Sequence, residues 1–388
     1  MRGSATLKQL ALDKFGIEFD RLDELDKNNL RIDFTNKARE MERIVDNIIV
    51  DGHYSFPSEN GDYNVVFTEA DRQLYDVFIY MNTNPKKIIE NQKNPEPSRL
   101  INQYSEKEID DWQKYEIKCM QSICKSLGIE LIVLHDDIDC AISFISELIR
   151  TPHRIIPKLI AKQNIKEKQN ILEYADTIVL IDCDKTLSIN DTTMTFCDYL
   201  DFDKKIIREN YRGEYYSTYQ FYRANRLYDE IVPDKYYSAC DYAADTAYLN
   251  EILIADIQSK SNDSITTIAV TAGILDIWER IQVSHSFPNA VIGKGRANSG
   301  GYYVSTLVKQ AIVEELQALG KKTIAIGDSP VDIGMLEAAD YGYLVATQKL
   351  NTGVAMYLSE TQQTRIKQLK YSPYKYDSIK EVNSIWQL

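Results

Sequence analysis

Two aspartates, Asp182 and Asp184, stand directly after an apolar segment, residues 177–181, that has the composition of a buried parallel strand. Open α/β sheets bind ligands at the carboxyl ends of their strands, so these two acids stand where chemistry is expected. Unpaired carboxylates at such a spacing repel each other and require a divalent cation or a shared proton. The pair therefore predicts a metal-assisted or acid–base site.

A second strand pattern covers residues 267–273 and ends in Thr271, Ala272 and Gly273. A hydroxyl and small residues at the end of a strand suit an anionic oxygen, because the side chain and the backbone amides can donate to it together. These residues predict the place where an anionic group of a ligand binds.

A lysine and two more acids complete the set. Lys309 begins an amphipathic helix, and residues 323–332 form a third strand pattern that ends in Asp328 and Asp332. A carboxylate that attacks a phosphate dianion meets like charge, and a metal cation together with an ammonium group can cancel this repulsion. The residue types and their order favour phosphoryl chemistry.

These segments resemble the four motifs of the haloacid dehalogenase superfamily of phosphotransferases, and the resemblance covers residues 177–345. It implies a Rossmann-like, doubly wound parallel sheet with a helical cap, Mg²⁺ dependence and an aspartyl-phosphate intermediate. The site residues that it implies are Asp182 as the nucleophile, Asp184 as the general acid and base, Thr271, Ala272 and Gly273 as the phosphate-binding motif, and Lys309 as the charge-neutralising lysine. The implied Mg²⁺ ligands are Asp182, Asp184 through its backbone carbonyl, and Asp328, with Thr186 and Asp332 in supporting positions.

Two further lysines bear on these assignments. Lys185 stands where many phosphatases of this group have Gly, although members similar to phosphoserine phosphatases vary at this place. Lys294 lies in a Gly-rich turn and is a rival to Lys309 for the lysine role. We expect Lys309 because Lys294 stands farther from Asp328.

Residues 191–263 form an insertion with a helical and aromatic pattern, similar to the cap of phosphoserine-phosphatase-like members that closes over the site and excludes water. We expect its aromatic residues to form mainly the cap core: Tyr211, Tyr215, Tyr216, Tyr219, Phe221, Tyr222, Tyr228, Tyr236, Tyr237 and Tyr242. Its cationic candidates for an anionic substrate are Arg208, Arg212, Arg223 and Arg226. Asp191 matches the Glu that binds the substrate amino group in phosphoserine phosphatases, which indicates a phosphorylated amine or amino acid.

The N-terminal half, residues 1–165, alternates strand and helix patterns and resembles P-loop kinases of the small nucleoside and nucleotide type. The resemblance rests on a strand pattern at 47–52, on residues 76–90, where a strand runs into a helix, and on a closing strand at 129–134. It implies an α/β domain of about 150 residues.

The phosphate-binding loop of this N-terminal domain is degenerate. Gly3-Ser4-Ala5-Thr6-Leu7 stands where Gly-Lys-Ser/Thr is expected, so Ser4 replaces the lysine that contacts phosphate and Ala5 replaces the hydroxyl that binds magnesium. We therefore expect a scaffold or specificity module without kinase activity.

The composition indicates a globular chain with more than one domain. Its 388 residues exceed what one core usually holds, and a polar stretch at 155–176 separates domains at 1–165 and 170–388. No apolar run approaches the roughly 20 residues that span a bilayer, and the first residues lack the apolar block of a secretory signal. The six cysteines are scattered, so we expect reduced thiols and a cytoplasmic protein.

The formal net charge of −13 does not suit non-specific binding to nucleic acid or anionic lipid. We therefore expect a small phosphorylated metabolite as the substrate and no membrane partner. A kinase-like domain followed by a phosphatase-like domain is also the order of polynucleotide kinase 3′-phosphatases, so a nucleic-acid end is the alternative substrate. A catalytically inactive regulatory or binding protein is a third hypothesis, ranked last because all four motifs are intact.

Overall fold

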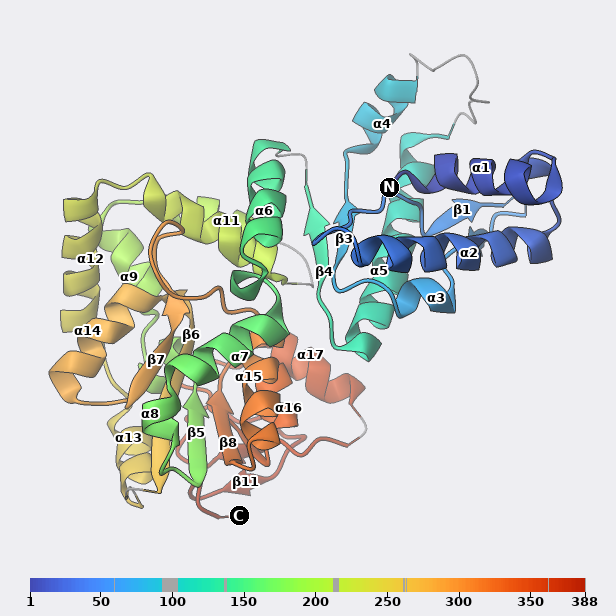
Figure 1. The fold of residues 1–388 in the computed structure, drawn as a ribbon. Helices are drawn as coiled ribbons and strands as arrows, with labels where there is room; N and C mark the ends of the chain where they lie inside the picture. Colours follow the sequence, from blue (N-terminus) through green and yellow to red (C-terminus); the bar gives the residue numbers. More distant parts are fainter. Residues whose placement is uncertain are drawn as a thin grey trace. The chain divides into compact units, whose positions relative to one another are not determined.

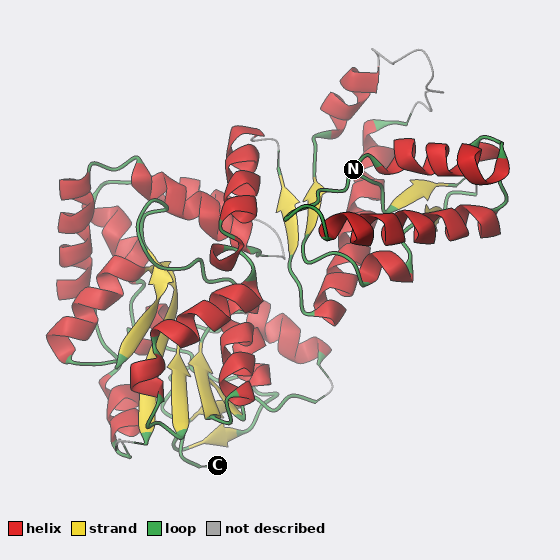
Figure 2. Cartoon of the chain, in the orientation of Figure 1, coloured by secondary structure: helices red, strands yellow, loops and turns green. Residues whose placement is uncertain are grey.

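The computed structural model describes residues 1–58, 60–92, 104–135, 138–211, 216–260, 262, 264–361 and 363–387. The chain forms two compact units, Met1–Ala141 and Ile142–Leu388. Both contain helices and strands (Figures 1 and 2). Each unit is described by itself.

The N-terminal unit contains α1 (Gly3–Phe15), α2 (Glu24–Glu42), β1 (Ser55–Pro57), β2 (Tyr63–Val65), α3 (Glu69–Arg72), β3 (Phe78–Met81), α4 (Pro85–Gln92), α5 (Glu106–Leu127) and β4 (Leu131–Leu134). β1 pairs antiparallel with β2, and β3 pairs parallel with β4. Helices α1 and α5 end at Gly16 and Gly128, which take the left-handed φ values of 69° and 63° that favour glycine after a helix.

The strand predicted at 47–52 does not form among the described residues. Ile49 is largely exposed, and Asp51 makes only an isolated bridge with Arg2. The apolar run therefore lacks the neighbouring strand that would bury it, and the described strands of this unit form two short sheets. The P-loop-kinase-like domain stays a prediction.

The second unit carries the predicted site. Its elements are α6 (Ile138–Arg150, which begins before the division), α7 (Pro157–Glu167), α8 (Gln169–Leu172), β5 (Thr177–Ile181), α9 (Thr192–Tyr199), α10 (Lys204–Asn210), α11 (Thr218–Asp229), α12 (Pro233–Asp245), α13 (Glu251–Gln258), β6 (Ile265–Ile274), α14 (Leu275–His285), β7 (Ala290–Lys294), α15 (Thr306–Ala318), β8 (Lys322–Gly327), α16 (Ile333–Ala338), β9 (Tyr341–Leu344), α17 (Thr352–Glu360), β10 (Lys367–Leu369) and β11 (Glu381–Val382).

The described strands of this unit form one parallel sheet in the order β11–β10–β9–β8–β5–β6–β7. From β5 the chain moves to β6 and β7 on one side, and then returns to β8 on the other. The strand order therefore reverses at β5, and open α/β sheets bind ligands at such a reversal. The predicted α/β fold with a parallel sheet is confirmed.

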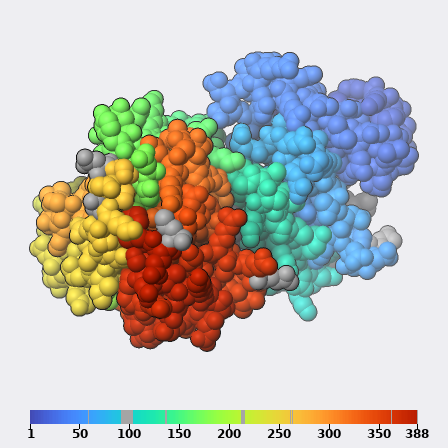
Figure 3. All heavy atoms as spheres, turned by 90° about the horizontal axis from the view of Figure 1, so that it is seen from below, coloured from blue at the N-terminus to red at the C-terminus, as the bar shows by residue number. Residues whose placement is uncertain are grey.

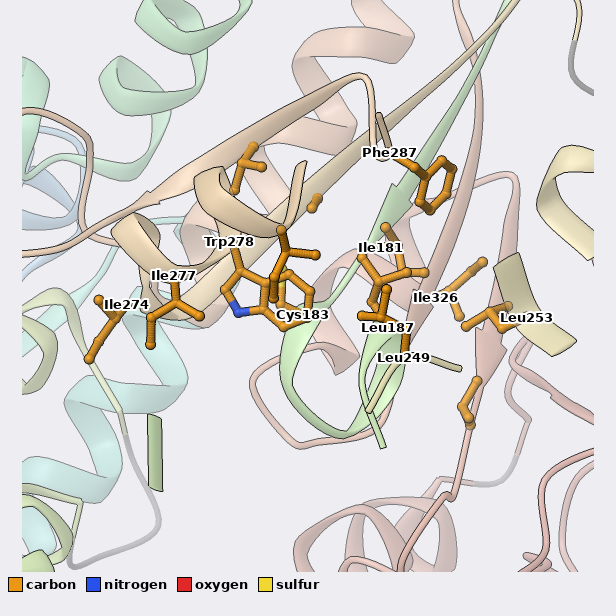
Figure 4. Packing of buried hydrophobic residues seen from close by; sticks show 14 of the residues in the cluster. Ile181, Cys183, Leu187, Leu249, Leu253, Ile274, Ile277, Trp278, Phe287 and Ile326 are labelled. Carbon is orange, nitrogen blue, oxygen red and sulfur yellow. The ribbon is translucent and has the colours of Figure 1, made fainter. Parts of the chain in front are cut away.

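Strand β5 is buried on both faces. Ile178 and Leu180 belong to one apolar cluster, and Val179 and Ile181 belong to the cluster on the opposite face. Figure 4 shows Ile181 in this second cluster, together with Trp278 of α14. Because burial of each such side chain contributes about 1.5–3 kcal/mol, the strand is a firm support for the residues that follow it.

Helix α7 packs against α15 in the second unit (Figure 1). Ile160, Ala161 and Ile165 are buried in the same cluster as Val308 of α15. The division at residues 141 and 142 thus comes earlier than the polar stretch at which we placed the domain boundary. The polar residues that indicated a linker alternate with these buried apolar residues along α7. The roles of the two domains stay predictions.

Helices α9 to α13 occupy the insertion predicted as a cap. Phe196 packs edge to face against Tyr228 and Tyr236. Of the predicted cap aromatics, Tyr219, Phe221, Tyr222, Tyr228 and Tyr236 are buried, Tyr211 and Tyr216 are half-buried, Tyr237 and Tyr242 are exposed, and Tyr215 lies outside the described residues. Of the arginines, Arg208 and Arg226 are exposed, Arg223 is half-buried, and Arg212 lies outside the described residues.

The C-terminal segment is attached to α13. The Ser384 hydroxyl and the Ile385 amide donate to the Asp256 carboxylate at 2.6 and 3.0 Å, and the Trp386 indole donates to the Asp256 carbonyl at 2.8 Å. In Figure 3 the red C-terminal residues and the yellow residues of this region form one continuous surface. Among the described helices, none combines the length and the apolar character needed to cross a bilayer.

Candidate active site

The site is built on the ends of β5 and β8 and on the first turn of α15. Asp182 follows β5, and its amide donates to the carbonyl of Ile326 in β8 at 2.8 Å, so the two strand ends are held together. Lys309 lies in the first turn of α15, which begins after Ser305, whose side chain caps the helix. Asp328 directly follows β8.

Lys309 joins two of the predicted acids. Its Nζ donates to Asp182 Oδ1 at 2.5 Å and to Asp332 Oδ1 at 2.6 Å, and its side chain is fully buried. Burial lowers the pKa of Lys309, but the carboxylates of Asp182 and Asp332 outweigh this effect and hold the pKa above its ordinary value. The lysine is therefore a fixed positive charge between the two acids.

The carboxylate of Asp332 is held from its other side by the loop after β8. Its Oδ2 accepts from the amides of Asp328 and Ser329 at 3.1 and 2.9 Å and from the Ser329 hydroxyl at 2.7 Å. These bonds fix the loop that carries Asp328, and they orient the second oxygen of Asp332 towards Lys309.

Asp182, Asp328 and Asp332 form the candidate metal cluster. Each offers a carboxylate oxygen, and the three oxygens lie within 4.8 Å of one another. Asp182 and Asp332 are buried and Asp328 is half-buried, and the hydroxyl of Thr186 donates to Asp328 at 3.3 Å. Burial, and then the charges of Asp182 and Asp332, raise the pKa of Asp328 well above its ordinary value. The cluster is thus a set of hard oxygen ligands whose mutual repulsion the single ammonium of Lys309 relieves only in part.

The Asp184 side chain turns away from this cluster towards the start of α9. Its Oδ1 accepts from the amide and the hydroxyl of Thr192, both at 2.6 Å, and its Oδ2 accepts from the Thr193 hydroxyl at 3.3 Å. Burial and then the nearby charge of Asp191 raise the pKa of Asp184 to about 7. Burial and then the charge of Asp332 raise the pKa of Asp182 to about 6.

The predicted anion-binding residues lie within the last part of β6. The hydroxyl of Thr271 accepts from the amide of Gly273 at 2.9 Å, and Ala272 lies between them. A Cβ at Gly273 would lie only 2.6 Å from Asp184 Oδ2 and 2.8 Å from the Thr193 hydroxyl. Only glycine fits here without a shift of the surrounding groups, so this segment and Asp184 are adjacent.

Lys185 and Asp191 form an ion pair beside Asp184. Lys185 Nζ donates to Asp191 Oδ2 at 2.6 Å, while Asp191 Oδ1 accepts from the amide of Met194 at the start of α9. The backbone of Lys185 is left-handed, with φ 62°, which is strained for a residue with a Cβ. Lys185 therefore occupies a position with a backbone conformation that glycine adopts without strain.

Lys294, the rival to Lys309, lies at the end of β7 and donates to the carbonyls of Ser299 and Gly300 at 3.0 and 3.5 Å. Burial lowers its pKa to about 8. Of the two lysines, Lys309 is the one bonded to Asp182 and Asp332.

Sequence reasoning missed three residues that hold the predicted acids: Thr192, Thr193 and Ser329. The two threonines follow Asp191, which caps α9, and an acid followed by hydroxyl residues is a recognisable helix-start signal. Such a signal indicates where a helix starts, but it does not show that the threonines contact Asp184.

Part of the sequence that carries this site matches the model of a known protein family. Residues 307–352, which include Lys309, Asp328 and Asp332, match the haloacid dehalogenase-like hydrolase family. This match supports the prediction that the chain is a phosphatase that resembles the haloacid dehalogenase superfamily. No curated protein matches the chain.

The solved structures that are similar to the chain include the following three. A HAD family hydrolase from Salmonella enterica serovar Typhi has 17% identity over 51% of this chain and 68% of its own, with a TM-score of 0.40. A phosphoserine phosphatase in apo form has 17% identity over 44% of this chain and 86% of its own, with a TM-score of 0.35. A probable phosphoserine phosphatase from Vibrio cholerae has 15% identity over 50% of this chain and 65% of its own, with a TM-score of 0.35.

Proposed function

We propose that the chain is a Mg²⁺-dependent phosphomonoester hydrolase that acts on a small phosphorylated metabolite through an aspartyl-phosphate on Asp182. The observation that carries this proposal is the buried ammonium of Lys309, 2.5 Å from Asp182 and 2.6 Å from Asp332, beside the carboxylate of Asp328. A carboxylate nucleophile for a phosphate needs this kind of compensation, because attack brings negative charges together.

The donor set fits Mg²⁺. The cation prefers carboxylate and carbonyl oxygens, and three clustered carboxylates share the one ammonium of Lys309. Asp182, Asp328 and the backbone carbonyl of Asp184 would hold the ion. When bound, the cation neutralises phosphoryl oxygens and offsets the repulsion between the carboxylates.

In the first step, an oxygen of Asp182 attacks the phosphorus and the bond from phosphorus to the leaving oxygen breaks. Lys309 keeps Asp182 in place and stabilises its charge. Thr271 with the amide of Ala272 would donate to the phosphoryl oxygens, and the amide of Gly273 would join them by exchanging its bond to the Thr271 hydroxyl. The result is an acyl phosphate on Asp182 and an alcohol, provided that the leaving oxygen receives a proton.

Asp184 would supply that proton. A carboxyl group acts best as an acid near its own pKa, and burial with the charge of Asp191 raises the pKa of Asp184 to about 7. In the second step the same group takes a proton from water, the water oxygen bonds to phosphorus, and Asp182 is released with inorganic phosphate. Thr192 and Thr193 hold the carboxyl in both steps.

We also propose that residues 1–165, which include the compact unit Met1–Ala141, form a degenerate P-loop-kinase-like domain that does not bind ATP. In support, the amide of Gly3 donates to the carbonyl of Asp51 at 2.9 Å and is thus already used, and Ser4 stands where a phosphate-binding lysine is expected. Titration of the full chain with ATP by calorimetry should show no binding. Micromolar affinity would contradict this proposal.

The proposed reaction is tested with Asp182→Asn and p-nitrophenyl phosphate. We expect the variant to lose hydrolysis while its circular dichroism spectrum and cooperative unfolding persist, because Asn has the same shape and cannot form an acyl phosphate. EDTA should silence the native chain and Mg²⁺ should restore it. Asp245→Asn, an exposed change on α12, is the matched control. Turnover by Asp182→Asn, or activity that resists EDTA, would refute the mechanism.

The substrate class is tested with a panel of phosphorylated metabolites and 3′-phosphorylated oligonucleotides. We expect hydrolysis of the small metabolites, because the net charge of −13 repels a nucleic-acid backbone. A preference for the oligonucleotides would contradict this expectation.

A further inference from the structure

Lys185 presents an ammonium group beside the acid that is proposed to protonate the leaving oxygen. Its Nζ is bonded to Asp191 and also interacts with the charges of Asp328 and Asp184, while 39% of its side chain stays exposed. An ammonium has three N–H donors, and Asp191 takes one of them. The group is therefore both close to the reaction and open to solvent.

Both carboxylate oxygens of Asp191 already accept a hydrogen bond in this arrangement. Its Oδ2 is bonded to Lys185 at 2.6 Å and its Oδ1 to the amide of Met194 at 3.0 Å. A substrate ammonium bound at the same carboxylate would lie beside Lys185, and the two cations would repel each other. This repulsion favours an anionic leaving group over the phosphorylated amine or amino acid that Asp191 indicated in the sequence.

The backbone of Lys185 points to a role for its side chain. Its φ of 62° lies in the region that glycine adopts without strain, and the turn is fixed because the Lys185 carbonyl accepts from the Thr347 hydroxyl at 2.7 Å. A residue with a Cβ in such a position is strained, and strain of this kind is found where function requires the side chain.

We infer that Lys185 is a specificity-determining residue that selects phosphomonoesters whose leaving alcohol carries an anionic group, such as a carboxylate, and disfavours those that carry an ammonium. This inference rests on the proposed phosphatase function. The ammonium of Lys185 receives the anionic group while the phosphoryl group lies at Asp182. Asp191 positions the ammonium and supplies no contact to the substrate.

The test uses two substrates of equal length and opposite charge, phosphoglycolate and O-phosphoethanolamine, and measures the ratio of their kcat/KM values. We expect the native chain to prefer phosphoglycolate. Lys185→Met and Lys185→Gly should both lower the ratio by about tenfold, which corresponds to about 1.4 kcal/mol. Lys185→Arg should keep it. Lys166→Met, which removes an exposed charge on α7, is the matched control and should leave the ratio unchanged.

The two neutral variants separate a charge effect from a backbone effect. Lys185→Met keeps a Cβ at φ 62°, whereas Lys185→Gly removes the strain as well, so a backbone effect would move the ratio in the glycine variant alone. A ratio that Lys185→Met leaves unchanged, or a native preference for O-phosphoethanolamine, would overturn the inference while hydrolysis itself stands. Failure of the native chain to hydrolyse these esters or p-nitrophenyl phosphate would instead overturn the proposed function, and the inference with it.

Discussion

Replacement of Asp184 by Asn should inactivate the enzyme and, at the same time, stabilise it. Asn keeps the shape of the side chain and an oxygen that can accept from the Thr192 amide and hydroxyl at the 2.6 Å positions. Its amide nitrogen can donate to the Thr193 hydroxyl, which now lies 3.3 Å away. The variant therefore removes a charge without creating a cavity.

The magnitude follows from the pKa of Asp184. Burial and the charge of Asp191 raise this pKa from 3.8 to about 7, which corresponds to about 4 kcal/mol of cost for the ionised form at high pH. Because the side chain keeps some contact with solvent, we expect the variant to gain about 1–3 kcal/mol in the free energy of unfolding at pH 8.

The pH dependence has a definite sign. Between pH 3.8 and 7 the folded chain binds the Asp184 proton more tightly than the unfolded chain, so this residue lowers the stability of the native protein as the pH rises. The stabilisation by Asp184→Asn should therefore be largest above pH 7 and fall towards zero near pH 4. Urea unfolding in EDTA at pH 4, 6 and 8 measures it, with Asp245→Asn as the control. A variant that is no more stable than the native chain at pH 8, or equally stabilised at pH 4, would refute the reasoning.

Three further predictions concern neighbouring residues. Lys309→Met should lower the free energy of unfolding in EDTA by about 3–5 kcal/mol, because it leaves Asp182 and Asp332 buried without their cation. Mg²⁺ should reduce this loss of stability. Urea titration with and without Mg²⁺ measures both effects, and an unchanged unfolding midpoint would contradict the expectation. Gly273→Ala should lower the free energy of unfolding by about 1–3 kcal/mol and should lower kcat, because its Cβ would lie 2.6 Å from Asp184. Gly52→Ala, which has open space around the new methyl group, is the control and should change neither quantity. Lys294→Met should change the pH dependence of stability. Burial lowers the pKa of Lys294 to about 8, so the native chain gains stability as the pH rises from 8 to 10.5. Unfolding curves across that pH range should show that the variant lacks this gain.

The central strands of the second unit were predictable because their signal is local. β5 occupies Thr177–Ile181, the range of the apolar segment, and β8 runs from Lys322 to Gly327, directly before Asp328. A strand that is buried on both faces needs a nearly continuous apolar run, so the sequence shows both its extent and the polar residue at its end. The convergence of Asp182 and Asp328 then follows from parallel pairing of β5 with β8.

Other features depended on contacts that no local pattern contains. The run at 47–52 is as apolar as a short strand, yet it forms none because no described strand lies beside it. β10 and β11 have three and two residues, too few for a recognisable alternation. The Lys185–Asp191 pair forms at a turn in which Lys185 is left-handed, and the sequence pattern alone does not predict a positive φ at a lysine.

The changes in the free energy of unfolding expected for Asp184→Asn and Lys309→Met have opposite signs. Their comparison therefore shows whether electrostatics or packing determines the stability of this site. Both substitutions nearly conserve the size of the side chain, so a packing account predicts little change in stability from either one. An electrostatic account predicts a gain when a repelled carboxylate is removed and a loss when the shared ammonium is removed. Both variants should also lose hydrolysis, since one lacks the proton donor and the other lacks the charge that stabilises Asp182. The site therefore holds its acids at the expense of stability, and ligands that neutralise them, a cation at Asp182 and Asp328 above all, should return part of that stability.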